Sequence, residues 1–269
     1  VTFNGKTFDL PLLRTRYVFA RRQCPLTAPV HLDLLFPARR LWKERLDSCA
    51  LTALEAEILG HRRFGDVPGE EIPALYFRYL QTGDGSPLVP VFQHNRQDIL
   101  ALVALAGTMG RILAGDPDPC LPAPDLFSLG RIYEDLGVLH RSMLCYELAI
   151  ERGLHGPART RALHRLSLLH KRLRQDERAV QIWHSLVDRG GLSSLFPYHE
   201  LAKYYEHRAR DPHKARQVVE KALELALVRL RLMTGESSVP DWDVADLRRR
   251  LERLRRKTAR ECPASLGKN

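Results

Sequence analysis

A proline-rich segment near the middle of the chain is the feature that most limits how these 269 residues can fold. Residues 116–124 read DPDPCLPAP, with four prolines in nine positions. Proline lacks a backbone N–H and fixes φ, so this density is incompatible with a helix interior or a central strand. The segment therefore predicts a linker between a first region, 1–115, and a second region that begins at 125.

Pairs of amphipathic helices are predicted throughout 125–235. The helices of these pairs cover 125–137 and 140–153, then 160–174 and 176–191, then 198–210 and 211–230. Ala149, Leu186 and Ala222 occupy corresponding positions and are separated by 37 and 36 residues. The pattern resembles tetratricopeptide repeats, whose unit is ~34 residues, with small residues where two helices touch. The alternative is three generic hairpins that pack on one another.

A basic helix and tail, 236–269, follow the predicted hairpins. Leu247, Leu251 and Leu254 share one side of a helix predicted over 243–260, and arginines cover the opposite side. This pattern is typical of a capping helix with a solvated polar face. Contact between the arginines and phosphate groups is the second interpretation.

The first region, 1–115, mixes two kinds of pattern. Short apolar runs at 1–3 and 30–36 predict strands, and helices are predicted over 10–20, 51–60, 72–83 and 97–113. The pattern Thr52-x-x-Glu55 predicts a capping box at the start of the second of these helices. Strands separated by helices predict an α/β fold, although two strands are too few to complete its sheet.

Charge and cysteine usage restrict the class of protein. The formal net charge of +10 favours polyanionic partners, of which nucleic acid is the commonest. The five cysteines are widely spaced and form no Cys-x-x-Cys pair, which favours reduced thiols over disulfides or a zinc site. No apolar run approaches the ~18 residues of a membrane span, so we expect a cytoplasmic protein with no membrane contact.

Three residues are candidates for a metal-dependent site. His94 and Asp98 are four positions apart, so on a helix they share one face. Asp9 follows the first predicted strand, where open α/β sheets place their ligands. Carboxylates suit hard divalent cations, and a histidine can orient or deprotonate a water. The plainer alternatives are a surface His–Asp pair and a helix-capping aspartate.

These motifs resemble those of the DEDD family of 3′–5′ exonucleases. FNGKTFDLPLL, residues 3–13, resembles the second family motif, Asn-x-x-x-Phe-Asp, which implies that Asp9 is a metal ligand. HNRQD, residues 94–98, resembles the third motif, which implies a metal-binding Asp98 and a catalytic His94. The spacing is that of the Tyr-x-x-x-Asp branch, with His94 in place of the tyrosine.

The chain between these motifs is similar to the YprB-type ribonuclease H-like proteins, as is YHELAKYYEHRARDP at 198–212. The resemblance implies a partial α/β ribonuclease H-like domain followed by an all-α, tetratricopeptide-like domain. The family also has an Asp-x-Glu motif upstream of Asn4, and none precedes it here. We therefore expect an N-terminally truncated fragment that lacks the first strands and two of the four acidic ligands.

Several further residues are predicted to meet nucleic acid. The resemblance implies that Asn4 and Phe8 shape the substrate cleft. Basic residues beside Trp42 and in a glycine-flanked loop could contact a phosphate backbone. These basic residues are Arg39, Arg40, Lys43, Arg62 and Arg63. A solvated helix start and an ordinary loop are equally open interpretations of the two groups.

The resemblance implies a protein that hydrolyses phosphodiester bonds from a 3′ end in its intact form, using two Mg²⁺ or Mn²⁺ ions. Its partner would be a single strand or 3′ end of nucleic acid, and DNA and RNA stay equally open. For the chain itself we expect little or no turnover, because Asp9 and Asp98 supply two carboxylates where the mechanism uses four. The alternative is a non-catalytic scaffold whose helical repeats bind a protein partner.

Overall fold

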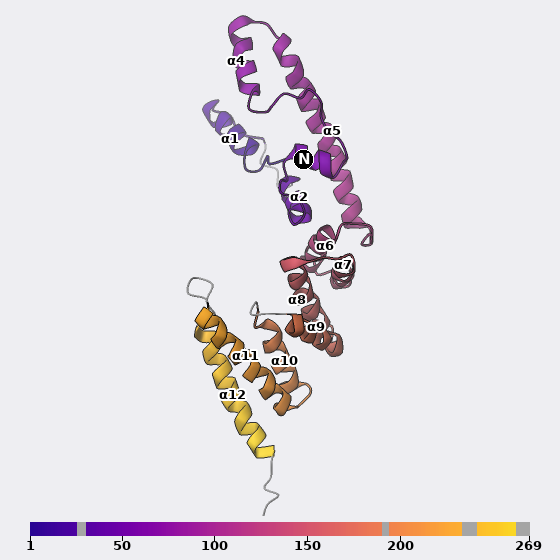
Figure 1. Cartoon of the computed structure of the whole chain (residues 1–269). Helices are drawn as coiled ribbons and strands as arrows, with labels where there is room; N and C mark the ends of the chain where they lie inside the picture. Colours follow the sequence, from indigo (N-terminus) through magenta and orange to yellow (C-terminus); the bar gives the residue numbers. More distant parts are fainter. Residues whose placement is uncertain (26–30, 190–193, 233–240, 262–269) are drawn as a thin grey trace, which may run out of the picture. The chain divides into compact units, whose positions relative to one another are not determined.

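The structure is a computed structural model that describes residues 1–25, 31–189, 194–232 and 241–261. The chain divides into two compact units, Val1–Leu154 and His155–Asn269. Figure 1 labels most of their helices along the chain.

The first unit holds seven α-helices and one 3₁₀ helix among its described residues. They are α1 (Asp9–Phe19), α2 (Leu35–Trp42), α3 (Leu51–Glu57), α4 (Ile72–Thr82), η1 (Ser86–Leu88), α5 (Val89–Ala114), α6 (Ala123–Asp135) and α7 (Leu139–Glu151). The second unit holds α8 (Gly156–Arg172), α9 (Asp176–Arg189), α10 (Phe196–His207), α11 (Pro212–Leu232) and α12 (Asp241–Glu261). Each predicted helix has a counterpart among these elements, and α5 begins eight residues before the predicted helix start at 97.

The expected α/β fold is wrong, because no strand occurs in the described residues. Among the described residues, the two apolar segments pair through their backbones in one isolated parallel bridge, between Thr2 and Asp33. The backbone N–H of Thr2 donates to the Leu32 carbonyl at 2.9 Å, and the N–H of Leu34 donates to Thr2 at 2.9 Å. The bridge stops there because α2 begins at Leu35. Position 30 of the expected second strand lies outside the described residues.

The apolar run after residue 33 belongs to a helix rather than to a strand. Leu35, Ala38, Leu41 and Trp42 are the buried residues of α2, a spacing that places them on one helical face. The side chain of Asp33 accepts hydrogen bonds from the backbone of Asn4, at 2.7 Å, and of Lys6, at 2.9 Å. Asp33 therefore fixes the loop that follows the first apolar segment.

The core of the first unit joins helices from both sides of the proline-rich segment. Trp42 of α2, Leu54 of α3, Leu105 of α5 and Tyr133 of α6 belong to one buried cluster. An ion pair between Arg45 and Asp125 adds two hydrogen bonds, of 2.8 and 3.0 Å, between the α2 side and α6. Segment 116–124 therefore lies inside the first unit and runs between α5 and the start of α6.

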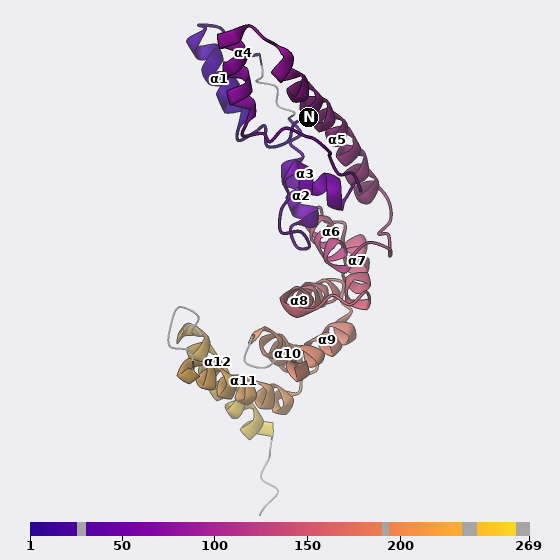
Figure 2. The same cartoon turned by 45° about the horizontal axis from the view of Figure 1, so that its top comes forward.

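Helices α6 and α7 form a hairpin whose contact depends on a glycine (Figure 2). A Cβ atom at Gly130 would lie 2.6 Å from Cε1 and 2.7 Å from Cδ1 of the Tyr146 ring. The hydroxyl of Ser142 also donates to the Gly130 carbonyl, at 2.8 Å. The small residue lets the two backbones approach closely enough for Tyr146 to be fully buried.

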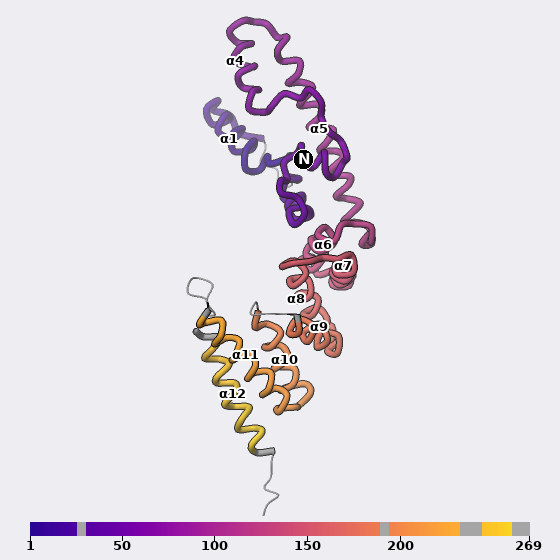
Figure 3. The backbone as a smooth tube through the Cα atoms, viewed as in Figure 1, coloured from indigo at the N-terminus to yellow at the C-terminus, as the bar shows by residue number. Residues whose placement is uncertain are grey.

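The second unit consists of two helix hairpins, α8–α9 and α10–α11, followed by α12 (Figure 3). Trp183 is buried between α8 and α9, and its indole N–H donates to the Ser167 hydroxyl at 2.9 Å. Leu247, Leu251 and Leu254 of α12 are buried against the hairpin residues. The predicted apolar side of the last helix is thereby confirmed.

One helical stretch, Ser86–Ala114, is long and apolar enough to cross a membrane by length and composition alone. This stretch differs from the expectation that no apolar run is long enough to span a membrane. Its buried residues, Ala101, Leu105 and Met109, lie on one side, and two of them belong to the core of the first unit. The absence of membrane contact stays a prediction.

Candidate functional site

A cluster of charged side chains surrounds Arg63 in the first unit. The cluster comprises Glu55 of α3, Arg63 and Asp66 of the loop that follows, and His94 and Asp98 of α5. The Arg63 side chain is only 5% exposed and that of Glu55 only 2%. Two predicted site residues, His94 and Asp98, are thus brought together with a third, Arg63.

The guanidinium of Arg63 links three carboxylates. Its Nε donates to Glu55 at 2.6 Å, its Nη1 to Asp66 at 3.0 Å, and its Nη2 to Asp98 at 2.6 Å. The hydrogen bond to Glu55 raises the pKa of Arg63 above its ordinary value, although burial opposes the shift. The fork of donors in arginine matches this arrangement, which a lysine could not reproduce. Arg63 therefore fixes its loop to α3 and α5.

His94 lies between two carboxylates of the cluster. Its Nδ1 is 2.8 Å from Oδ1 of Asp66, and its Nε2 is 3.5 Å from Oδ2 of Asp98. Because a carboxylate only accepts, the Nδ1 nitrogen is the donor toward Asp66. Burial acts to raise the pKa of Asp66, but hydrogen bonds from His94 and Arg63 outweigh it and lower the value. The predicted shared face of His94 and Asp98 on one helix is confirmed.

A cavity of about 330 Å³ adjoins the Arg63 cluster between α3 and α5. Glu55, His61 and Gln97 supply its polar lining, and Leu59 and Leu100 are among its apolar residues. The side-chain oxygen of Gln97 is buried and has no hydrogen-bond partner in the structure. A donor group in this cavity would satisfy that oxygen, although most of the lining is apolar.

The predicted residues near the start of the chain lie in a separate arrangement. Asn4 adopts a left-handed backbone with φ of 65°, and its N–H donates to Asp33. Phe8 precedes α1 and is 65% exposed. Asp9 is the first residue of α1 and is exposed to solvent. A carboxylate at this position interacts favourably with the helix dipole.

The predicted basic residues differ in their surroundings. Arg39 and Arg40 lie on α2 and Lys43 follows it; all three are exposed, and Arg40 forms an ion pair with Asp135. Arg62 is exposed, whereas its neighbour Arg63 is engaged with the carboxylates described above. A phosphate that approached Arg63 would compete with three anionic partners. The exposed residues are more accessible to a phosphate backbone.

The described residues do not fit a two-metal site. Across the part of the chain that the structure describes, no group of three or more His, Cys, Asp or Glu side chains could hold a metal ion. Asp98, the predicted ligand in the Arg63 cluster, accepts from a guanidinium instead. The positive charge that a metal would supply to these carboxylates comes from Arg63.

Sequence reasoning did not identify Glu55, Asp66 and Gln97 as members of this region. The predicted capping box that would include Glu55 is wrong, because α3 starts at Leu51 with Ala50 at its N-cap and no side-chain cap. Asp66 had a recognisable signal, because it follows Arg63 by three residues in a glycine-flanked loop. Gln97 lies three residues after His94 on α5, one helical turn away.

Comparison with known proteins adds two findings. Residues 1–110 match a family model described as the RNase_H superfamily. Over 259 residues the chain is 31% identical to the uncharacterized protein YprB of Bacillus subtilis (strain 168). The match covers 96% of this chain and 60% of the relative, so the chain spans less than two thirds of that protein's length.

Proposed function

We propose, from the RNase_H superfamily domain over residues 1–110, that the chain is the nucleic-acid-binding part of a nuclease-type protein. The superfamily match is the observation that carries the proposal. The net charge of +10 supports it, because a basic protein attracts the phosphate backbone. Superfamily members commonly use divalent metals. More specifically, we propose that the intact protein is a 3′–5′ exonuclease of the DEDD type.

For the 269-residue chain we propose binding without turnover. His94 and Asp98 stand 3.5 Å apart, a geometry in which the imidazole could orient or accept a proton from a water held by the carboxylate. Hydrolysis of a phosphodiester also needs charge neutralisation at the attacking and leaving oxygens. The described residues gather no metal ligands for this, and Arg63 already occupies Asp98.

The test uses the purified full chain and a fluorescently labelled single strand, as DNA and as RNA. We expect binding by fluorescence anisotropy at low salt that weakens steeply as salt rises. We expect no shortening of either strand on a denaturing gel with Mg²⁺ or Mn²⁺. Absence of binding at low salt would contradict the proposed function, and metal-dependent release of nucleotides would contradict the lack of turnover.

A pair of variants tests whether the exposed residues near α2 take part. Arg39→Gln combined with Lys43→Gln removes two exposed cations, and Arg14→Gln with Arg16→Gln removes two others from α1. The slope of log K against log salt is negative, and each lost phosphate contact lowers its magnitude by about 0.7 for a single strand. The α2 pair should therefore lower the magnitude of the slope by about 1.4, and the α1 pair should leave it unchanged.

A scaffold that binds a protein partner is the second candidate, and the hairpins support it. The contact between Gly130 and Tyr146, with Ala149 buried nearby on α7, is consistent with tetratricopeptide-like packing of small and aromatic residues. Capture of a protein partner by a chain that binds neither DNA nor RNA would favour this candidate.

A further inference from the structure

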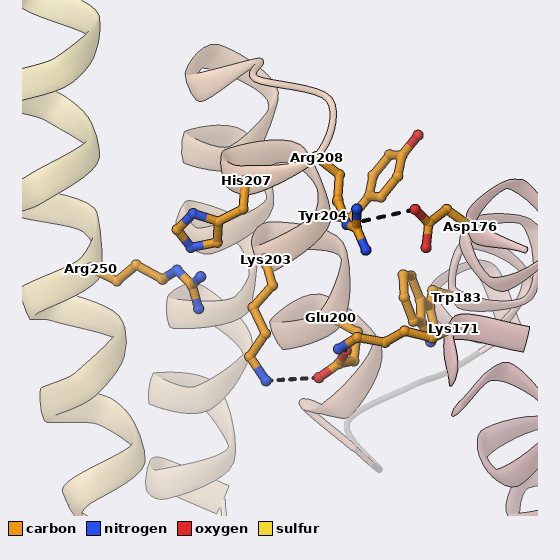
Figure 4. Close-up of a pocket in the computed structure, with 9 residues that line it drawn as sticks. All are labelled: Lys171, Asp176, Trp183, Glu200, Lys203, Tyr204, His207, Arg208 and Arg250. Atoms are coloured by element: carbon orange, nitrogen blue, oxygen red, sulfur yellow. Dashed lines mark hydrogen bonds and ion pairs between the residues drawn. The ribbon is translucent and has the colours of Figure 1, made fainter. Parts of the chain in front are cut away.

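A cavity in the second unit gathers cationic side chains that the proposed site in the first unit does not use. It has a volume of about 430 Å³ and lies among α8, α9, α10 and α12. Figure 4 shows Arg250 of α12 reaching toward Lys203 and His207 of α10. The lining also includes two further cations, Lys171 and Arg208, and two aromatic residues, Trp183 and Tyr204.

Two buried carboxylates hold several of these cations, together with Arg253 and Lys257, which lie outside the cavity lining. Glu200 of α10 is 7% exposed in its side chain and binds Lys203 at 2.8 Å and Lys171 at 2.5 Å. Glu206, only 1% exposed, binds Lys257 at 2.8 Å, Arg253 at 2.9 Å and Arg250 at 3.3 Å. Each carboxylate therefore holds more than one cation in a fixed position.

The resulting cluster has a surplus of positive charge. A third pair, Arg208 with Asp176 at 3.7 Å, lines the same cavity. Among these described side chains, six cations face three carboxylates, so three positive charges are not neutralised within the cluster. We call these six cations the basic cluster: Lys171, Lys203, Arg208, Arg250, Arg253 and Lys257.

Three side chains of the basic cluster are about half exposed to solvent. The side chains of Lys203, Arg253 and Lys257 are 50%, 53% and 47% exposed. Cations that are anchored by a buried carboxylate lose less side-chain entropy on binding than free surface lysines do. An anion that reaches them finds several donors already in place.

We infer that the basic cluster binds the phosphate backbone of a single-stranded nucleic acid, with Tyr204 at the edge of the cavity available to stack a base. This inference rests on the proposed function and assigns it a second contact site, in the helical unit. A polyphosphate strand suits the site because it presents anionic groups in series, matching cations spread over α8, α10 and α12. Half-buried Tyr204 and exposed His207 give the aromatic surface that bases require.

The test compares two triple variants of the full chain. The site variant carries Lys203→Gln, Arg253→Gln and Lys257→Gln, which leaves Glu200 with Lys171 and Glu206 with Arg250. The control variant carries Lys221→Gln, Arg248→Gln and Arg256→Gln, three exposed cations of α11 and α12. By helical spacing, 248 lies on the opposite side of α12 from 250, 253 and 257, and 256 lies about a quarter of a turn from the middle of that side.

Binding of a labelled single strand is measured by fluorescence anisotropy over a series of salt concentrations. Loss of three phosphate contacts should lower the magnitude of the slope of log K against log salt by about 2 and the low-salt affinity by about tenfold or more. The control variant has the same net charge and should keep the wild-type slope. Circular dichroism and thermal unfolding establish that both variants remain folded.

The possible outcomes are separable. If the wild-type chain binds the strand and both variants weaken equally, or neither weakens, the inference is wrong while the proposed function stands. If the wild-type chain does not bind at all, the proposed function itself fails. Tighter binding of labelled poly-glutamate than of the strand, lost in the site variant, would assign the basic cluster to an acidic protein segment and overturn the inference.

Discussion

Single residues decide how closely the helices of this protein approach. Gly130 in α6 and Ser167 in α8 are small residues that lie against Tyr146 and Trp183 of the following helix. In the first hairpin the aromatic ring takes the volume that a Cβ would occupy. In the second hairpin, the hydroxyl of Ser167 lies against the Trp183 ring and accepts a hydrogen bond from the indole N–H. Both contacts bury a large ring between two helices.

The fit at Gly130 predicts an unusual result for a glycine in a helix. Gly130→Ala should lower the free energy of unfolding by about 1–3 kcal/mol, because the added methyl overlaps the Tyr146 ring. Gly107→Ala in α5 is the matched control, since nothing lies within 4 Å of its added Cβ. Gly107→Ala should raise the free energy of unfolding by about 0.5–1 kcal/mol, because alanine has a higher helix propensity than glycine. Urea denaturation measures both, and equal effects would contradict the close approach.

Among the secondary-structure elements, the Arg63 cluster connects one loop to two helices, α3 and α5. Glu55 belongs to α3, and His94 and Asp98 belong to α5, so neither helix can shift without disturbing the ion pairs. The loop between α3 and α4 has little apolar material to hold it, and Phe64 is 90% exposed. The polar cluster, rather than packing, therefore fixes this loop.

Removal of the central cation should destabilise the first unit. Arg63→Gln leaves the buried Glu55 without its charged partner, and we expect a loss of about 3 kcal/mol. Arg62→Gln changes an exposed neighbour and should stay within about 0.5 kcal/mol of wild type. Denaturant unfolding followed by circular dichroism distinguishes them. A loss as small for Arg63 as for Arg62 would show that the cluster does not hold the loop.

At the scale of the whole molecule, each unit has its own core and its own charged centre. The first unit buries residues from five helices around Trp42, and the second packs α12 on the hairpin α10–α11. Glu206 connects α10 to α12 through three cations. In contrast, α1 and α4 bury no residue, and Phe77 and Phe92 are more than half exposed. The first unit thus leaves these large apolar side chains exposed.

The second unit should depend on pH through Glu206. Burial alone would raise the pKa of this carboxyl, but hydrogen bonds from Arg253 and Lys257 lower it to about 2, from an ordinary 4.5. A lowered folded-state pKa contributes stability that is complete above 4.5 and is lost as the pH falls toward 2. The stability difference between wild type and Glu206→Gln should therefore shrink over this range.

Thermal unfolding at several pH values measures that difference. Glu224→Gln, which alters an exposed carboxyl on α11, serves as the control and should differ little from wild type at any pH. A stability difference between wild type and Glu206→Gln that stays constant from neutral pH to pH 2 would show that the ionised Glu206 carboxylate does not stabilise the second unit.

Helical periodicity was sufficient to predict most elements, because the spacing of apolar residues determines which side of a helix can be buried. Leu247, Leu251 and Leu254 were placed correctly on that basis, as was the shared face of His94 and Asp98. The same reasoning failed at 30–36, where a short apolar run has no period long enough to separate strand from helix. There the structure forms one bridge and then α2.

The sequence by itself determined the helices, the basic charge and the motifs that resemble a nuclease family, because these depend on local spacing and composition. Only the tertiary structure decided the partners of each charge. Arg63 contacts Glu55 and Asp98, which are 8 and 35 residues away in the sequence. Glu206 contacts Lys257, which is 51 residues away. Such contacts depend on how helices pack, which no local pattern encodes. That is why Arg63, expected to meet phosphate, is instead bound to carboxylates.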